Sequence, residues 1–345
     1  MKAAVLKAFG GPENLEFTTV PDPVPGPGEV LLRVRACALN HLDLWIRDGL
    51  PSAKVSVPLI LGCDVAGEVV SLGEGVEGIP VGGRYAVHPG RSCGKCPACL
   101  DGRESDCPDF GIIGAYGGRP GGYAELIAVP VQDLLPMTPE QSFAEAAAAP
   151  LTFLTAWHML VTLAKLQSGE IVLVIGAGAG VATAAISIAK SLGARLIATS
   201  TSKEKLERVN ALGADIVGIQ YPPEDLVRTV RKRTSGQMAD VAFEHVGGSV
   251  IGEALKCLRR SGRLVTCGAT AGAVAPIDLR YVFDRQLKIL GAKMGSRAEM
   301  RAVWAKIAAG ELKAVVDRTF PLAEARAAHE YLAARGQFGK VVLLP

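Results

Sequence analysis

The sequence lacks an excess of either charge. Among its 345 residues, 37 Lys and Arg stand against 34 Asp and Glu, and the two signs are interspersed along the chain. Because it has no basic stripe and no polybasic run, we expect no nucleic-acid partner and no membrane partner. Internal repeats and low-complexity tracts are missing too. The composition, 49% hydrophobic and 21% charged, is typical of a folded globular protein.

The sequence also lacks a recognisable secretory leader and a clear membrane span. The short apolar run at the N-terminus is broken by Lys7 and has no cleavage site behind it, so we expect a cytoplasmic protein. Residues 171–189 form an uncharged stretch of 19 residues, close to the roughly 20 that span a bilayer. The consecutive segments "IVLVIG", "AGAG" and "VATAAISIAKSLGA", the last of which continues to residue 194, instead predict a buried strand, a turn and a helix.

Two successive patterns predict two domains of an α/β protein, as expected for a chain of this length. Up to residue 151, short β-like runs separated by Gly and Pro predict a compact β unit. From 152 to 293, alternating strand-like and helical segments predict a doubly wound parallel sheet. The tail from 294 ends in "GKVVLLP", a strand that we expect to return to the β unit and make it discontinuous, with residues 1–151 and 294–345.

Four cysteines lie within fifteen residues in "RSCGKCPACLDGRESDC", namely Cys93, Cys96, Cys99 and Cys107. In a cytoplasmic chain this density indicates a metal site rather than disulfides. Four thiolates suit one structural zinc per chain, in a lobe over residues 91–110, and leave no coordination position open for chemistry. The alternatives are an iron–sulfur cluster, whose last Cys gap in ferredoxins is three residues rather than the seven found here, and metal-free thiols.

A glycine-rich turn between strand and helix predicts a dinucleotide site. Gly176, Gly178 and Gly180 precede the predicted helix, and Ala182 occupies the third fingerprint position. Glycines allow a pyrophosphate to approach the backbone, and the helix N-terminus supplies N–H groups and a positive dipole. The alternative is that these glycines serve only to pack the turn.

The end of the next strand, "RLIATS", favours NADP(H) over NAD(H). An NAD site places Asp or Glu there, whereas this chain has Ser200, Thr201 and Ser202, followed by Lys203 and Lys205. Hydroxyls and cations suit a 2′-phosphate, which a carboxylate would repel. A helix N-cap at Ser202 is a second interpretation that is compatible with the first.

Several longer motifs resemble the medium-chain dehydrogenase/reductase superfamily, which contains zinc alcohol dehydrogenases and quinone oxidoreductases. They are "GPGEVLLRVRACALNHLDLWIRDG", "PLILGCDVAGEVVSLGEGV", the cysteine lobe, "APLTFLTAWHML", the glycine turn, "RQLKILGAKMGS" and "FGKVVLLP". The resemblance spans essentially the whole chain. It implies a GroES-like β-domain plus a Rossmann domain, and a homodimer in which the strand near "KILGAKMG" pairs across a two-fold axis.

The chain departs from the zinc alcohol dehydrogenases at the positions that hold their catalytic metal. Asn40 stands where the first cysteine ligand is expected, Gly62-Cys63-Asp64 replaces a Gly-His-Glu motif, and Leu151 aligns near the third ligand. Leu42 and Trp45 occupy the proton-relay positions. Without an open three-ligand zinc, nothing polarises an alkoxide, so alcohol oxidation by that mechanism is disfavoured.

The resemblance therefore implies the zinc-less branch, in which NADPH reduces an activated C=C bond, in an enone or enoyl thioester, or a quinone. Two alternatives stay open. One is an alcohol dehydrogenase whose unusual metal site is assembled from Cys37, His41, Asp43 and Cys63, and the other is a cofactor-binding protein of low activity.

The resemblance also implies roles for individual residues. Those expected to contact the cofactor are Thr155 at the nicotinamide, Gly178, Gly180 and Val181 at the pyrophosphate, and Ser200, Ser202, Lys205 and Tyr221 at the 2′-phosphate. The expected catalytic residues are Asn40, His41 and Cys63, with Asn40 contacting the carbonyl of a small-molecule substrate. His41 and Tyr116 are the candidate proton donors, although a capped histidine and a surface tyrosine are the alternative interpretations.

Overall fold

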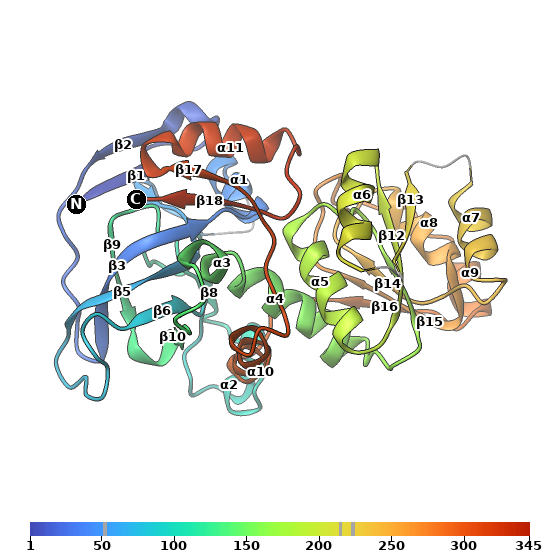
Figure 1. Ribbon diagram of the computed structural model, residues 1–345, viewed down its shortest axis with the longest axis horizontal. Helices are drawn as coiled ribbons and strands as arrows, with labels where there is room; N and C mark the ends of the chain where they lie inside the picture. Colours follow the sequence, from blue (N-terminus) through green and yellow to red (C-terminus); the bar gives the residue numbers. More distant parts are fainter. Residues whose placement is uncertain (51–53, 214–215, 222–224) are drawn as a thin grey trace. The chain divides into compact units, whose positions relative to one another are not determined.

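The computed structural model of the chain describes residues 1–50, 54–213, 216–221 and 225–345 (Figure 1). These residues form two compact units. The first consists of Met1–Leu151, Ser296–Gly310 and Ala314–Pro345, and the second of Thr152–Gly295 and Glu311–Lys313.

The first unit is built mainly from antiparallel strands, which confirms the β unit predicted for it. The strands of its largest sheet, in spatial order, are β10 (Leu134–Pro136), β6 (Arg84–Val87), β5 (Asp64–Leu72), β3 (Glu29–Ala38), β18 (Lys340–Leu344) and β17 (Val316–Pro321), with β9 (Leu126–Pro130) also paired to β3. A second sheet contains β2 (Leu15–Thr19), β1 (Lys2–Leu6) and β4 (Leu59–Ile60). Two short strands, β7 (Gly90–Arg91) and β8 (Gly111–Ile112), flank the cysteine lobe.

The long strand β3 shows why this sequence forms a half-buried sheet. Its alternate residues Val30, Leu32, Val34 and Ala36 are buried, as the period of two along a strand requires. The C-terminal strand β18 runs antiparallel to β3, and its Val342 pairs with Ala38. Ala38 also pairs with the first residue of β5 on its other side. The amino ends of β18 and β5 therefore both lie at the carboxyl end of β3.

The helices of this unit begin and end at recognisable signals. α1 (His41–Asp48) begins directly after β3, and it ends at Gly49, whose φ of 90° is in the left-handed region. A capping box in which Ser142 and Glu145 bond each other starts α3 (Phe143–Ala147). The other helices of this unit are α2 (Pro97–Leu100), α10 (Arg297–Ala308) and α11 (Ala325–Ala333). α4 (Pro150–Trp157) begins in this unit, but from Thr152 onward it and the π-helix that continues it (His158–Leu163) belong to the second unit. Single 3₁₀ turns lie at Pro12–Asn14, Glu104–Asp106, Val131–Asp133 and Leu322–Glu324.

The second unit is a six-stranded parallel sheet, which confirms the predicted doubly wound fold. Its strands in spatial order are β13 (Ile216–Gln220), β12 (Arg195–Ser200), β11 (Ile171–Val174), β14 (Ala239–Glu244), β15 (Leu258–Thr266) and β16 (Lys288–Gly291). Its helices are α5 (Gly180–Ser191), α6 (Lys203–Ala211), α7 (Leu226–Arg233), α8 (Val250–Lys256) and α9 (Leu279–Asp284). Strand order reverses at β11, and in such sheets the ligand crevice opens at the carboxyl ends of the strands beside that point.

The uncharged stretch 171–189 consists of β11, whose four residues are all buried, the glycine turn and most of α5. Buried small residues of α5, including Ala182, Ala184 and Ala185, allow the helix to pack closely. Over the described ranges, no helix combines the length and hydropathy needed to cross a membrane.

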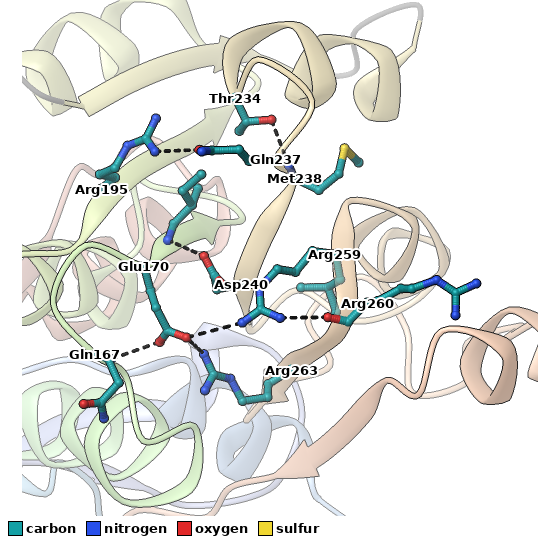
Figure 2. A network of polar contacts seen from close by, with 12 residues as sticks. Gln167, Glu170, Arg195, Thr234, Gln237, Met238, Asp240, Arg259, Arg260 and Arg263 are labelled. Carbon is teal, nitrogen blue, oxygen red and sulfur yellow. Dashed lines mark hydrogen bonds and ion pairs between the residues drawn. The ribbon is translucent and has the colours of Figure 1, made fainter.

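A polar network connects the amino ends of the strands in the second unit (Figure 2). Asp240 accepts a hydrogen bond of 2.8 Å from the backbone N–H of Ile171 and pairs with Arg259. Glu170, the residue before β11, pairs with Arg263 at 2.5 Å. These bonds hold β11, β14 and β15 at one edge of the sheet, so the carboxyl edge is left for ligands.

Candidate functional site

The cysteine lobe has the geometry of a closed metal site. The ligand atoms of Cys93, Cys96, Cys99 and Cys107 all lie within 4.8 Å of one another, and the sulfurs of Cys93 and Cys99 are 3.9 Å apart. Zinc–sulfur bonds of about 2.3 Å in a tetrahedron give sulfur separations of roughly 3.8 Å, so the four residues fit zinc. Backbone N–H groups of Lys95 and Cys96 lower the pKa of Cys93 to about 6, which favours the thiolate. With four thiolates the site has no position for a substrate.

The other metal arrangement considered from the sequence is not assembled. In the described part of the chain, no second group of three or more His, Cys, Asp or Glu ligand atoms converges in this way. Cys37 and Cys63 are both buried, and burial raises the pKa of each thiol well above its usual value. Both therefore stay protonated near neutral pH, a form in which cysteine is a poor metal ligand.

The glycine turn and the start of α5 can accept an anion. Gly176 adopts a φ of +66°, in the left-handed region. The neighbouring N–H of Ala177 donates to the carbonyl of Thr199 at 2.8 Å, which ties the turn to β12. The N-cap residue Ala179 has no capping side chain, and the first turn of α5 carries no acid. The structure places Gly178, Gly180 and Val181 here, so the uncapped N–H groups fit a cofactor phosphate.

The end of β12 carries hydroxyls and no acid, as the sequence shows. Ser200 is buried, and its Oγ accepts a hydrogen bond of 3.2 Å from the N–H of Ser202. Ser202 in turn caps α6, because its Oγ accepts from the N–H of Lys205 at 3.3 Å. The N-cap interpretation of Ser202 is thus present in the structure, beside the predicted phosphate role.

Two further predicted cofactor residues have defined surroundings. Tyr221 lies beside Ser200, since its N–H donates to the Ser200 carbonyl at 2.7 Å. Its hydroxyl donates to Glu253 at 2.8 Å, and burial together with this carboxylate raises the pKa of Tyr221 to about 12. Any 2′-phosphate contact by Tyr221 must therefore compete with Glu253. Thr155 lies buried on α4.

In the first unit, Asn40 is part of a buried polar cluster that sequence reasoning missed. Lys340 Nζ donates to Asn40 Oδ1 at 2.6 Å and to Asp64 Oδ2 at 2.9 Å. Asn40 Nδ2 also donates to Asp64 Oδ2, at 2.9 Å, and lies 3.5 Å from Cys63 Sγ. The N–H of Leu151 donates to Asp64 Oδ1 at 2.8 Å. We refer to Asn40, Asp64 and Lys340 as the buried triad.

The buried triad is charged but shielded from solvent. Lys340 is 4% exposed and Asp64 is 0% exposed. A buried ammonium is tolerated when it is paired and its hydrogen bonds are satisfied, as two of its three are here. The three residues stand where α1, β5 and β18 begin, and the pairing of β3 with both strands brings these beginnings together. Asn40, the residue that the resemblance puts in place of the first metal ligand, thus accepts a hydrogen bond from an ammonium.

Asp43 is a second buried carboxyl group beside the buried triad. Its Oδ2 accepts from the N–H of Asn40 at 2.7 Å and its Oδ1 from the N–H of Gly62 at 3.2 Å. Burial raises the pKa of Asp43 to about 7, against the opposing effects of the Asn40 N–H and the Lys340 charge. Asp43 therefore titrates near neutral pH, while it holds the backbone at Asn40 and Gly62.

The two candidate proton donors lie in different settings. Tyr116 is half-buried, and burial, with a smaller effect of the nearby Cys63, raises its pKa to about 12, so it is a weak acid. His41 is the first residue of α1 and is partly exposed. Asn40 and Cys63 are brought together by the fold, and the catalytic roles of these residues stay predictions.

Comparisons with known proteins agree with this architecture. Residues 26–139 match an alcohol dehydrogenase GroES-like domain, and residues 180–309 match a zinc-binding dehydrogenase family. A 2-haloacrylate reductase from a Burkholderia species is 32% identical over 99% of this chain and 98% of its own length. A quinone oxidoreductase from Pseudomonas aeruginosa is 32% identical over 100% of this chain and 99% of its own.

Two other matches extend the range of activities among similar proteins. An acryloyl-coenzyme A reductase from Metallosphaera sedula is 31% identical over 99% of both chains. A solved structure of an NAD-dependent alcohol dehydrogenase is 43% identical, covers 100% of both chains and superposes with a TM-score of 0.94.

Proposed function

The chain belongs to the medium-chain dehydrogenase/reductase superfamily, and we propose that it is an NADP(H)-dependent oxidoreductase that works without a catalytic metal. Its substrate is an activated C=C bond, in an enone or enoyl thioester, or a quinone. The observation that carries this proposal is the buried triad, in which the Lys340 ammonium bonds Asn40, the residue expected in place of the first zinc ligand, and Asp64. The names of the haloacrylate, acryloyl and quinone reductases among its relatives support it.

The electrostatics of the first unit oppose a second, catalytic zinc. Divalent metals bind deprotonated ligands, whereas Cys37 and Cys63 are buried thiols with raised pKa values. The nearby ammonium repels a further cation. An alcohol dehydrogenase with an unusual metal site is therefore the less favoured hypothesis. It is tested below because a similar solved structure is named as an alcohol dehydrogenase.

For reduction of an activated double bond, the protein must hold the substrate, provide donors for the charge that forms on its carbonyl oxygen, and supply a proton. NADPH supplies the hydride when bound. Asn40 suits the donor role: one of its N–H groups bonds Asp64, but the other faces only the weak acceptor Cys63 at 3.5 Å. That second N–H can transfer to a substrate oxygen at little cost, while Lys340 holds the carboxamide in place.

Selection of NADPH over NADH rests on the end of β12. Ser200 ends β12 where an NAD site would carry an acid, and it suits a 2′-phosphate together with Ser202 and Lys205, although Glu204 also lies in the first turn of α6. Some similar proteins are described as NAD-dependent, so the preference is a proposal for this chain alone. We further propose that the cysteine lobe binds one zinc per chain as a structural element, and that the protein is cytoplasmic.

The decisive experiment combines metal counting with an activity panel. Purified protein is analysed for zinc and then mixed with NADPH and, separately, with enones, enoyl thioesters and quinones. We expect about one zinc per chain and NADPH oxidation by at least one substrate class, with deuteride from labelled NADPH at the β-carbon of a reduced enone. Two zincs with alcohol oxidation would replace this proposal, and NADPH binding without turnover would indicate a cofactor-binding protein.

A further inference from the structure

Strand β14 ends at Glu244 and is followed by His245, and no sequence motif marked either residue for a function. Glu244 is fully buried, and its oxygens are committed to the chain itself. Oε1 accepts from the N–H groups of Val246 and Gly247, and Oε2 accepts from Thr266 Oγ1 at 2.8 Å. Glu244 therefore shapes the turn after β14 and has little capacity left for a ligand.

His245 differs because its ring is buried but not satisfied. The residue is 8% exposed, and its Nε2 has no hydrogen-bond partner among the residues that the structure describes. The ring lies against the first glycine of the turn after β11. A Cβ at Gly176 would lie only 3.3 Å from both Cε1 and Nε2 of His245. A buried polar nitrogen without a partner is unfavourable, which points to a ligand that is bound in the working protein.

The strand order indicates which part of a ligand lies there. β12, β11 and β14 are neighbours and parallel, so their carboxyl ends form one edge. A dinucleotide spread along this edge has its adenosine ribose at the end of β12 and its pyrophosphate at the turn between β11 and α5. The next group along the edge is the nicotinamide-side ribose, and His245 lies at the carboxyl end of β14, next to that position.

We propose that Nε2 of His245 forms a hydrogen bond with a hydroxyl of the nicotinamide-side ribose of the bound dinucleotide. Together with the uncapped start of α5, this contact positions the nicotinamide half of the cofactor. Burial lowers the pKa of His245, so the ring is neutral at neutral pH, and a ribose hydroxyl can donate to Nε2 or accept from it. This inference rests on the proposed cofactor but not on the proposed substrate.

The test measures binding of three ligands by calorimetry to the full, zinc-loaded chain. They are NADPH, 2′-phospho-ADP-ribose, which lacks only the nicotinamide, and adenosine 2′,5′-bisphosphate, which lacks the whole distal half. His245→Ala should weaken the first two roughly tenfold and leave the third unchanged. His245→Gln should recover most of the loss, because its amide group, which can donate or accept, reaches nearly the same point. If the wild type prefers NADH, the matching set is NADH, ADP-ribose and AMP.

A matched control is His88→Ala in the first unit. His88 is also buried, with a ring nitrogen that lacks a partner among the described residues. The change in NADPH affinity in this variant therefore reports the general effect of deleting a buried imidazole. Wild-type affinity for NADPH in His245→Ala, or equal loss for all three ligands, would overturn the inference. A wild type that binds no dinucleotide overturns both this inference and the proposed function. NADPH binding without any substrate turnover overturns only the function.

Discussion

Replacing Lys340 with Met tests whether the buried triad depends on its ammonium. In the wild type, the fully buried carboxylate of Asp64 accepts from Lys340, Asn40 and the N–H of Leu151. The variant keeps the length of the side chain but leaves a buried carboxylate without a counter-charge. Removing one partner of such a pair costs about 3–5 kcal/mol. We therefore expect the free energy of unfolding of the first unit to fall by that amount.

The assay is urea unfolding followed by tryptophan fluorescence. In a Trp157→Phe background, the remaining indoles, Trp45 and Trp304, both belong to the first unit, so the signal reports that unit. The double variant Lys340→Met with Asp64→Asn should regain at least about 2 kcal/mol of the free energy of unfolding that Lys340→Met loses, because two neutral groups need no counter-charge. The reasoning would be refuted if Lys340→Met lost less than about 1 kcal/mol of the free energy of unfolding. It would also be refuted if the loss in the double variant equalled the sum of the losses in Lys340→Met and Asp64→Asn.

Four further outcomes follow from other parts of the chain. Ser200→Asp should shift cofactor preference toward NADH, and unchanged NADPH affinity in a titration would contradict the 2′-phosphate assignment. Because the pKa of Asp43 is raised to about 7, the folded state binds its proton more tightly than the unfolded state does. The free energy of unfolding should therefore fall by up to roughly 4 kcal/mol through this group as the pH rises from about 4 to 7. Asp43→Asn should flatten that part of the profile in unfolding experiments. Cys96→Ser should abolish zinc in metal analysis and destabilise the first unit, with NADPH affinity retained because the cofactor edge lies in the second unit. For the homodimer that the resemblance implies near "KILGAKMG", Phe283→Asp should lower the mass seen by light scattering to that of a monomer, since Phe283 is 71% exposed and precedes the edge strand β16; a monomeric wild type or an unchanged dimer mass would argue against that interface.

The features that the sequence predicts well are those whose parts are neighbours in the chain. The cysteine lobe converges because its ligands stand within one loop, and the turn before α5 forms because strand, glycines and helix are consecutive. The alternating pattern likewise predicts the parallel sheet. In contrast, Lys340 and Asp64 are 276 positions apart, and their contact depends on the pairing of β18 with β3. Tyr221 gives a similar case, because the sequence contains no sign that Glu253 on α8 bonds its hydroxyl.

The two buried polar sites also differ in what they require from outside the chain. In the buried triad, Asn40, Asp64 and Lys340 satisfy one another, so the first unit needs no metal to neutralise its buried carboxylate. At the carboxyl edge of the second unit, α5 begins without a capping side chain, and the buried Nε2 of His245 has no hydrogen-bond partner among the described residues. Because buried polar groups are rarely left unpaired in working proteins, this asymmetry favours chemistry carried by a bound dinucleotide rather than by a second metal.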